Sequence, residues 1–364
     1  MHTATYQISL DNGHSLFACE VTHGATTTKG TTANTAPRRS QQGEAGNGRD
    51  NINNRIHCDG VFVVIVVHGG PGLNSHKESF EGLKPLLLTA ADPSSSTANT
   101  TAAATSRDPS CCPWIHAILF YDQLGCGASQ GPPVPPQSAN SNGDETTGLY
   151  SLAYYVDELQ QVLQHTQQRF PGLKIGLLGH SWGGQIVVEY LLQQDTTTTT
   201  VLCHAATISN APLNESTYEQ KQQDIRRALP DDVRVFLELE EQEMAKNDAS
   251  LGAAIYQKLI GMSDTAITGE MKNWNALARI QQSSSRLPCP CLFVAGTNDT
   301  IPHKEYESLV LERKTADSNA SSSDGGGGFK AQVAILDHGD HAPFYGDTAQ
   351  AYIHRIQAFL EGIC

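Results

Sequence analysis

The chain has 364 residues, enough for one large domain or for a domain that carries an insertion. Its 38 acidic and 24 basic residues give a formal net charge of −14, which argues against binding to nucleic acid or to an anionic membrane. Hydrophobic residues make up 39% of the chain, so the core must come from a few apolar segments.

The cysteines and the first residues of the chain indicate the cellular compartment in which the protein is found. The nine cysteines are odd in number, several fall in apolar segments, and no C-x-x-C pair occurs, so neither a disulfide framework nor a zinc site is expected. The first residues lack a charged region followed by an apolar run, so no signal peptide is predicted. The longest apolar run, residues 61–67, is far too short to span a bilayer. We therefore expect a cytoplasmic protein without a membrane span.

Four segments have the low-complexity composition of surface loops. They are rich in Ser, Thr, Asn, Gly and Pro and cannot bury enough apolar area to offset the entropy of ordering. We expect neither regular structure nor a catalytic role in them. These segments are residues 22–54, 92–110, 131–148 and 317–328.

With these loops set aside, strands and helices alternate along the chain. The first half predicts a hairpin over 6–10 and 14–21, strands over 61–67, 115–120 and 174–178, and helices over 79–91, 152–169 and 185–194. The second half predicts a strand over 204–209, a mostly helical stretch over 214–280, strands over 291–295 and 331–336, and helices over 306–312 and 348–360. Continuous apolar runs indicate strands that are covered on both faces.

This alternation predicts an α/β fold with a mostly parallel, doubly wound sheet. The helical stretch interrupts the alternation after the sixth predicted strand, so we interpret it as a cap inserted into the core. The core would comprise residues 1–212 and 286–364, and the cap residues 213–285.

A serine lies between glycines where the strand over 174–178 turns into a helix, in G-H-S-W-G (residues 179–183). Such a turn holds the serine in a strained conformation that only small neighbours permit, and it exposes the hydroxyl beside a helix N-terminus. The N–H of the next residue, Trp182, could bind a developing oxyanion. The alternative is a glycine-rich crossover with a buried serine. The strand before and the helix after favour a nucleophile, Ser181.

The segment H-G-G-P-G (residues 68–72) follows another predicted central strand. The second oxyanion N–H should come from this position, and we assign it to Gly70. Glycines let the backbone approach a ligand closely and proline fixes the turn, so Gly69 and Pro71 are predicted to contact the substrate. We expect His68 to brace the loop. A plain turn would explain H-G-G-P-G alone, but not its pairing with the serine turn.

A third motif, Y-D-Q-L-G-C-G-A-S (residues 121–129), follows the strand over 115–120. Together with H-G-G-P-G and G-H-S-W-G-G it resembles the proline iminopeptidase group of the α/β-hydrolase superfamily, in order and in spacing once the loops are discounted. The resemblance implies an α/β-hydrolase fold and a peptidase that removes amino-terminal residues from peptides or amino acid amides. In such relatives the third motif shapes the floor of the site.

A serine nucleophile needs a base, and the base needs a carboxylate that holds its tautomer. In this fold the chain order is serine, acid, histidine. The family carries its acid in G-x-x-D-x-x-P, which places it at Asp299, although this N-D pair could be only a turn. The family pattern small-x-His-x-Pro places the base at His341. His338 is the alternative, but the base must lie on the loop past the strand to reach Ser181. We interpret His180 as a packing residue.

The segment S-D-T-A-I-T-G (residues 263–269) resembles the family's cap segment. The resemblance implies that Asp264 holds the substrate's ammonium group, although this aspartate could instead cap a helix. No cluster of His, Cys and Asp has metal-ligand spacing, so neither a metal nor another cofactor is expected.

The predicted function is a serine aminopeptidase that releases proline or another small or apolar residue from short peptides or amino acid amides through an acyl-enzyme. Two alternatives remain. One is an esterase or amidase that uses the same residues without specificity for a free amine. The other is a non-catalytic binding protein of the same fold.

Overall fold

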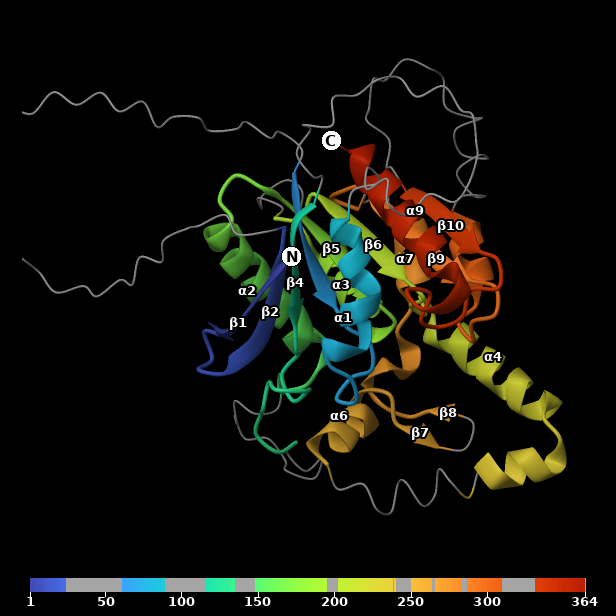
Figure 1. The fold of residues 1–364 in the computed structure, drawn as a ribbon. Coiled ribbons are helices and arrows are strands. Elements are labelled where there is room, and N and C mark those ends of the chain that lie inside the picture. The colour runs from blue at the N-terminus through green and yellow to red at the C-terminus, as the bar shows by residue number, and fades with distance from the viewer. Residues whose placement is uncertain are drawn as a thin grey trace, which may run out of the picture.

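The structure is a computed structural model that describes residues 1–23, 61–88, 115–134, 148–194, 202–237, 239, 250–263, 266–282, 287–309 and 331–363. A single eight-stranded sheet forms the centre of this part of the chain, and helices cover both of its faces (Figure 1). The predicted loop segments fall for the most part outside the described residues.

The sheet has the strand order β1-β2-β4-β3-β5-β6-β9-β10. Only the pairs β1/β2 and β2/β4 are antiparallel, so the prediction of a mostly parallel sheet is confirmed. The strands are β1 (His2–Ser9), β2 (Ser15–Thr22), β3 (Phe62–Val67), β4 (Ile115–Tyr121), β5 (Lys174–His180), β6 (Ala205–Ser209), β9 (Cys291–Gly296) and β10 (Ala331–Leu336).

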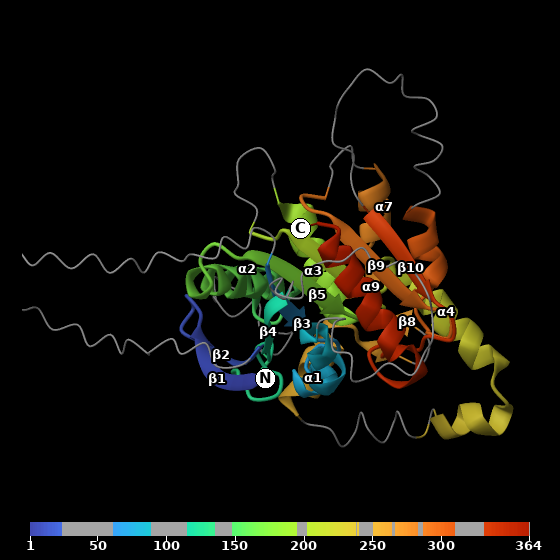
Figure 2. The same cartoon turned by 45° about the horizontal axis from the view of Figure 1, so that its top comes forward.

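Two apolar clusters, one on each face, hold the helices to the sheet. Helices α2 (Leu152–Arg169) and α3 (Trp182–Gln193) pack on one face. Helix α1 (Lys77–Leu83), the 3-10 helix η1 (Lys84–Leu87) and α9 (Ala349–Glu361) cover the other (Figure 2). Every residue of β3 is buried, because helices lie on both sides of this strand.

The predicted helix over 79–91 is the element that differs most from its expected bounds. It begins two residues earlier, at Lys77, and after Leu83 it tightens into η1, which carries Pro85 at its start. Proline lacks the backbone N–H that an α-helix needs, so the α-helix cannot continue through it. The described helix therefore ends before the expected position.

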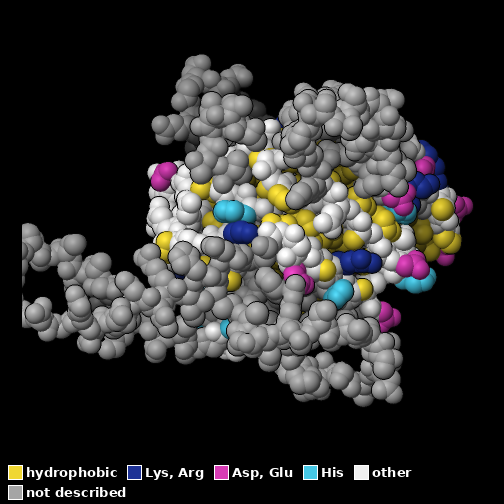
Figure 3. Space-filling model, turned by 90° about the horizontal axis from the view of Figure 1, so that it is seen from above, with side chains coloured by type: hydrophobic (Ala, Val, Ile, Leu, Met, Phe, Trp, Pro, Cys, Tyr) yellow, Lys and Arg dark blue, Asp and Glu magenta, His cyan; other side chains and the backbone are white. Residues whose placement is uncertain are grey.

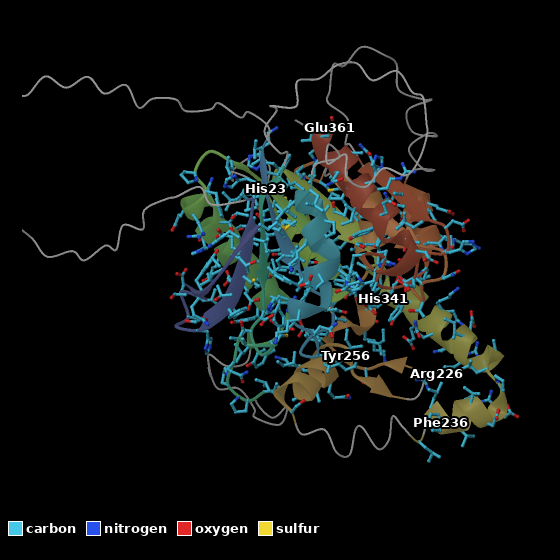
Figure 4. The ribbon with its side chains drawn as sticks, viewed as in Figure 1. His23, Arg226, Phe236, Tyr256, His341 and Glu361 are labelled. Carbon is cyan, nitrogen blue, oxygen red and sulfur yellow. The ribbon has the colours of Figure 1, made fainter. Side chains whose placement is uncertain are left out.

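The chain between β6 and β9 forms helices and short strands outside the eight-stranded sheet, and the last of these helices packs against α3. It contains α4 (Glu215–Ala228), α6 (Leu251–Leu259), β7 (Met262–Ser263), β8 (Ala266–Ile267), the 3-10 helix η4 (Glu270–Asn273) and α7 (Ala276–Gln282). We expected this stretch to be mostly helical, and the small antiparallel β7/β8 sheet is an addition. Helix α4, with Arg226, and the helical segment with Phe236 extend away from the body (Figure 4).

Helix α6 lies directly against the loop that follows β3. A Cβ atom on Gly72 would overlap the carbonyl of Gly252, and one on Gly252 would overlap the carbonyl of Gly72. Because this loop follows the carboxyl end of β3, α6 covers the carboxyl end of the sheet. In parallel α/β sheets, ligands bind at that end.

On the face seen in Figure 3, the acidic and basic side chains of the described residues lie scattered among uncharged ones. Among the described helices, none combines the length and the apolar composition that a membrane span requires. The five cysteines within the described residues are all free and buried, at positions 19, 126, 203, 289 and 291.

Candidate active site

Ser181 lies at the sharp turn between β5 and α3, in the middle of the sheet. Its backbone has φ 53° and ψ −123°, a region that non-glycine residues rarely adopt. The strain persists because the surroundings hold the turn: Ser181 N–H donates to the carbonyl of Ser209 at 2.9 Å, at the end of the neighbouring strand β6. The side chain is thereby directed away from the strand and the helix that flank it.

The glycines of the serine motif are needed because β5 and α3 lie unusually close to their neighbours. A Cβ atom on Gly183 would overlap the carbonyl oxygen of Val67 in β3, and one on Gly179 would overlap the backbone of Gly183. A side chain at either position would push α3 away from the sheet. The G-x-S-x-G spacing therefore has a packing cause in this chain.

Three side chains predicted from distant parts of the sequence form a continuous chain of hydrogen bonds. Ser181 Oγ lies 3.0 Å from His341 Nε2. On the other side of the ring, Nδ1 lies 3.0 Å from Asp299 Oδ1 and 3.1 Å from Oδ2. The Asp299 side chain is fully buried, whereas that of His341 is 45% exposed. A buried carboxylate thus contacts an imidazole whose other nitrogen faces an accessible hydroxyl.

Asn210, which the sequence analysis did not single out, completes the surroundings of Asp299. It follows β6 directly, has φ 48°, and is fully buried. Its Nδ2 donates to Asp299 Oδ2 at 2.5 Å and to the carbonyl of Asp340 at 3.0 Å. One amide therefore ties the carboxylate to the loop that carries His341. A polar residue at the carboxyl end of the strand beside the serine strand was the signal for this contact.

The electrostatics of Asp299 favour its ionised form. Burial acts to raise the pKa of Asp299, but the hydrogen bond and charge of His341 outweigh it, helped by Asn210 and the N–H of Ile301. The result is a pKa below the usual 3.8. At neutral pH the carboxylate is charged and accepts the Nδ1–H of His341, which leaves Nε2 as the acceptor for the serine hydroxyl.

The pKa of His341 is shifted in the opposite direction. Burial acts to lower the pKa of His341, but the hydrogen bond and charge of Asp299, with smaller contributions from Glu78 and Asp340, raise it above 6.5. Glu78 lies in the first turn of α1, and Tyr345 from the loop of His341 donates its hydroxyl to the Glu78 carbonyl at 2.7 Å. Negative charge thus lies on several sides of the imidazole and favours its protonated form during proton transfer.

His180 contacts the loop that carries His341 through a hydrogen bond and a ring contact. Its Nε2 donates to the His341 carbonyl at 2.6 Å, and its ring packs against Phe344. Burial and the charge of His341 lower the pKa of His180 to about 3, so the ring is neutral. We interpreted His180 as a packing residue, and the structure adds this hydrogen bond. His338, the alternative to His341, has an 82% exposed side chain near Asp337, away from Ser181.

The loop that carries Gly70, one of the two proposed oxyanion donors, lies beside the serine turn. A Cβ atom on Gly69 would lie 3.0 Å from Cβ of Ser181, so the loop after β3 touches the serine turn. Gly70 has φ 59°, which favours glycine there. In the described part of the chain, the N–H groups of Gly70 and Trp182 have no protein acceptor. Both remain available to a ligand atom.

Asp264 and Pro71 were also predicted to contact the substrate, and both assignments stay predictions. Asp264 lies outside the described residues. Pro71 is buried in the turn that joins Gly70 to Gly72. Within the described ranges, no group of three or more His, Cys, Asp or Glu side chains is placed to hold a metal ion.

Comparison with known proteins identifies the family. The model of a family described as serine aminopeptidase, S33, matches residues 116–325, more than half of the chain. The chain belongs to the S33 serine aminopeptidase family. It is therefore an enzyme of the serine aminopeptidase kind, with the α/β-hydrolase fold predicted from its motifs.

The relatives of this S33 aminopeptidase agree with that assignment. Proline iminopeptidase of Heyndrickxia coagulans is 25% identical over 332 residues, which cover 82% of this chain and 91% of that protein. Proline iminopeptidase of Lactobacillus crispatus is 34% identical over 150 residues, 41% of this chain and 37% of that protein. The crystal structure of a proline iminopeptidase from Mycobacterium smegmatis covers 99% of this chain and 98% of its own, with a TM-score of 0.59 and 16% identity.

Proposed function

We propose that Ser181, His341 and Asp299 form the catalytic triad of an aminopeptidase that releases the amino-terminal residue of a short peptide or amino acid amide. The observation that carries this proposal is the unbroken series of hydrogen bonds from Ser181 Oγ through the His341 ring to Asp299. Nucleophile, base and orienting carboxylate are within reach of one another without rearrangement.

The reaction follows from this geometry. His341 Nε2 takes the proton of Ser181 as Oγ attacks the substrate carbonyl, and the imidazolium then gives that proton to the leaving amine. The N–H groups of Gly70 and Trp182 bind the oxyanion of the tetrahedral intermediate. Water attacks the acyl-enzyme by the same route and frees the amino acid.

The substrate proposal rests on the family and on charge. Several relatives are named proline iminopeptidases, so we propose proline or another small or apolar residue at the amino terminus. A buried ammonium needs a carboxylate partner. We propose that the cap, residues 213–285, covers the site and supplies Asp264 as this partner. Because the described cysteines are free thiols, we also propose that the enzyme works in the cytoplasm.

The decisive variant is Ser181→Ala, compared with wild type on aminoacyl-coumarylamides. Alanine should keep the turn, and the acylation rate should fall by about 10³-fold or more. A fluorophosphonate should label wild type at Ser181 and leave the variant unlabelled. Labelling of another serine, or unchanged turnover in the variant, would contradict the triad.

Acetylating the substrate amine separates the proposed aminopeptidase from an esterase or amidase of the same fold. Acetylation removes the positive charge, so turnover should fall by several orders of magnitude if the site recognises the ammonium. Asp264→Asn should weaken kcat/KM for free-amine substrates by about 2–4 kcal/mol and leave neutral esters almost unchanged. Equal cleavage of acetylated and free substrates would favour the esterase.

A further inference from the structure

The motif Y-D-Q-L-G-C-G-A-S contributes no group to the reaction proposed above, yet its Asp122-Gln123 pair is completely buried at the carboxyl end of β4. Burying an amide and a carboxylate is costly unless each polar atom has a partner. Apart from Ala128 of the motif itself, the side-chain partners of this pair lie in the loop over residues 68–76, which we call the oxyanion loop, or in the serine turn. The contacts therefore indicate what the motif does.

Three of the hydrogen bonds that Gln123 makes join two different elements. Its backbone N–H donates to His68 Nε2 at 3.1 Å, and its side-chain Nε2 donates to the His68 carbonyl at 2.8 Å. Its Oε1 accepts the indole N–H of Trp182 at 3.0 Å. One side chain therefore connects the residue that precedes Gly69-Gly70 with the residue that follows Ser181.

The tautomer of His68 is consistent with this arrangement. His68 Nε2 accepts from Gln123, so Nδ1 carries the proton and donates to the Gly69 carbonyl at 2.8 Å. Burial lowers the pKa of His68, which keeps the ring neutral and Nε2 free to accept. The bonds thus run without interruption from Trp182 through Gln123 and His68 to Gly69.

Asp122 holds the other end of the same loop. Its Oδ1 accepts the backbone N–H of His76 at 2.6 Å and lies 2.7 Å from His76 Nδ1. Its Oδ2 accepts the N–H of Ala128 at 2.8 Å. The oxyanion loop is therefore anchored at both ends by the two consecutive residues that follow β4, Asp122 and Gln123.

We propose that Gln123 is a positioning residue that sets the spacing of the two oxyanion donors, the N–H groups of Gly70 and Trp182, by linking His68 to the Trp182 indole. The inference rests on the proposed acyl transfer at Ser181. Oxyanion donors act only when they lie at hydrogen-bond distance from the position that the developing charge will occupy. Without the Gln123 side-chain amide, the oxyanion loop and the serine turn would keep their backbone conformations. They would lose the hydrogen bonds that align them with each other.

The test is Gln123→Met, since methionine is unbranched and fills a similar space without polar bonds. Removing one oxyanion donor typically lowers kcat by about 10²–10³-fold, so a displaced donor should lower it by about 10–100-fold. KM should stay within about threefold of wild type, because the donors act mainly in the transition state. Trp182→Phe removes the same bond from the other side, and the two substitutions together should lower kcat no more than either alone.

The matched control is Gln185→Met. Gln185 is also buried, one turn after Ser181 in α3, and its Nε2 donates to the carbonyl of Pro212 at 3.3 Å and to Glu215. Gln185→Met loses a comparable number of side-chain hydrogen bonds, but none of them reaches the oxyanion loop. The kcat of this variant should therefore stay within about twofold of wild type. If Gln123→Met and Gln185→Met lower kcat equally, measured below both melting temperatures, the positioning role is refuted.

The rate at which a fluorophosphonate labels Ser181 gives a readout that needs no peptide substrate. Gln123→Met should slow this labelling by about the same factor as kcat, because the phosphonyl oxygen uses the same donors. Gln123→Glu should recover part of the labelling rate at low pH, expressed relative to wild type at the same pH, because a buried, protonated carboxyl can make both bonds. If wild type is labelled but cleaves no aminoacyl amide, the aminopeptidase proposal fails while the labelling rates still decide the role of Gln123. Unchanged labelling in Gln123→Met would overturn that role.

Discussion

The buried carboxyl group of Glu158 makes the stability of this protein depend on pH in a way that can be calculated. Glu158 lies in α2 and is 1% exposed. Its Oε2 accepts the N–H of Leu124 at 3.0 Å, while Oε1 has no partner among the described residues. Burial raises the pKa of Glu158 from 4.5 to about 8, and only the Leu124 hydrogen bond opposes the shift appreciably.

The sign of the effect follows from the two pKa values. Below pH 4.5 the carboxyl is protonated in both the folded and the unfolded chain, so its contribution to stability is fully present. As the pH rises toward 8, only the unfolded chain releases the proton, and the free energy of unfolding falls by up to about 1.4 kcal/mol per pH unit. Between pH 5 and pH 8 this amounts to about 3.5 kcal/mol.

Glu158→Gln removes the titrating group. The free energy of unfolding of the variant, relative to that of wild type, should therefore rise by about 3.5 kcal/mol between pH 5 and pH 8. Urea denaturation at both pH values, at constant ionic strength, measures the difference. The matched control is Asp157→Asn, the exposed neighbour in the same helix, which should change stability by no more than about 0.5 kcal/mol at either pH. Parallel pH dependences for wild type and Glu158→Gln would refute the assignment of a buried, proton-binding carboxyl.

Three other measurements address the site and the core. The pKa of His341 lies above 6.5, so kcat/KM should fall on the acid side of a midpoint above pH 6.5, and Glu78→Gln should move that midpoint to lower pH by a few tenths of a unit. Asp299→Asn should lower kcat by about 10⁴-fold without unfolding the protein, because the carboxylate that holds the His341 proton on Nδ1 is lost. A decrease of only about tenfold would argue against an orienting role. Burial raises the pKa of the Cys203 thiol, so peptide mapping should find it alkylated by iodoacetamide only after unfolding.

Local patterns in the sequence were sufficient for most elements and for the three side chains of the proposed triad. Helix α2 and β10 have the predicted bounds, because apolar periodicity and the flanking turn residues act over a few neighbouring positions. Ser181 was evident for the same reason, since its glycines serve close packing at the turn itself. Asp299 and His341 followed from chain order and from the resemblance, which fix where an acid and a base occur along the chain but not how near they lie.

Contacts between strand ends far apart in sequence were decided only by the tertiary structure. Asn210 reaches Asp299 because β6 and β9 are neighbours in the sheet, and Gln123 reaches Trp182 because β4 and β5 flank β3. No local pattern encodes that adjacency. The places of the two histidines relative to the serine depend on the same packing: His338 has φ 58° and an exposed side chain, while His341 Nε2 lies 3.0 Å from Ser181 Oγ. Sequence periodicity specifies which segments form strands and turns, whereas pairing and packing of the whole chain determine which side chains meet.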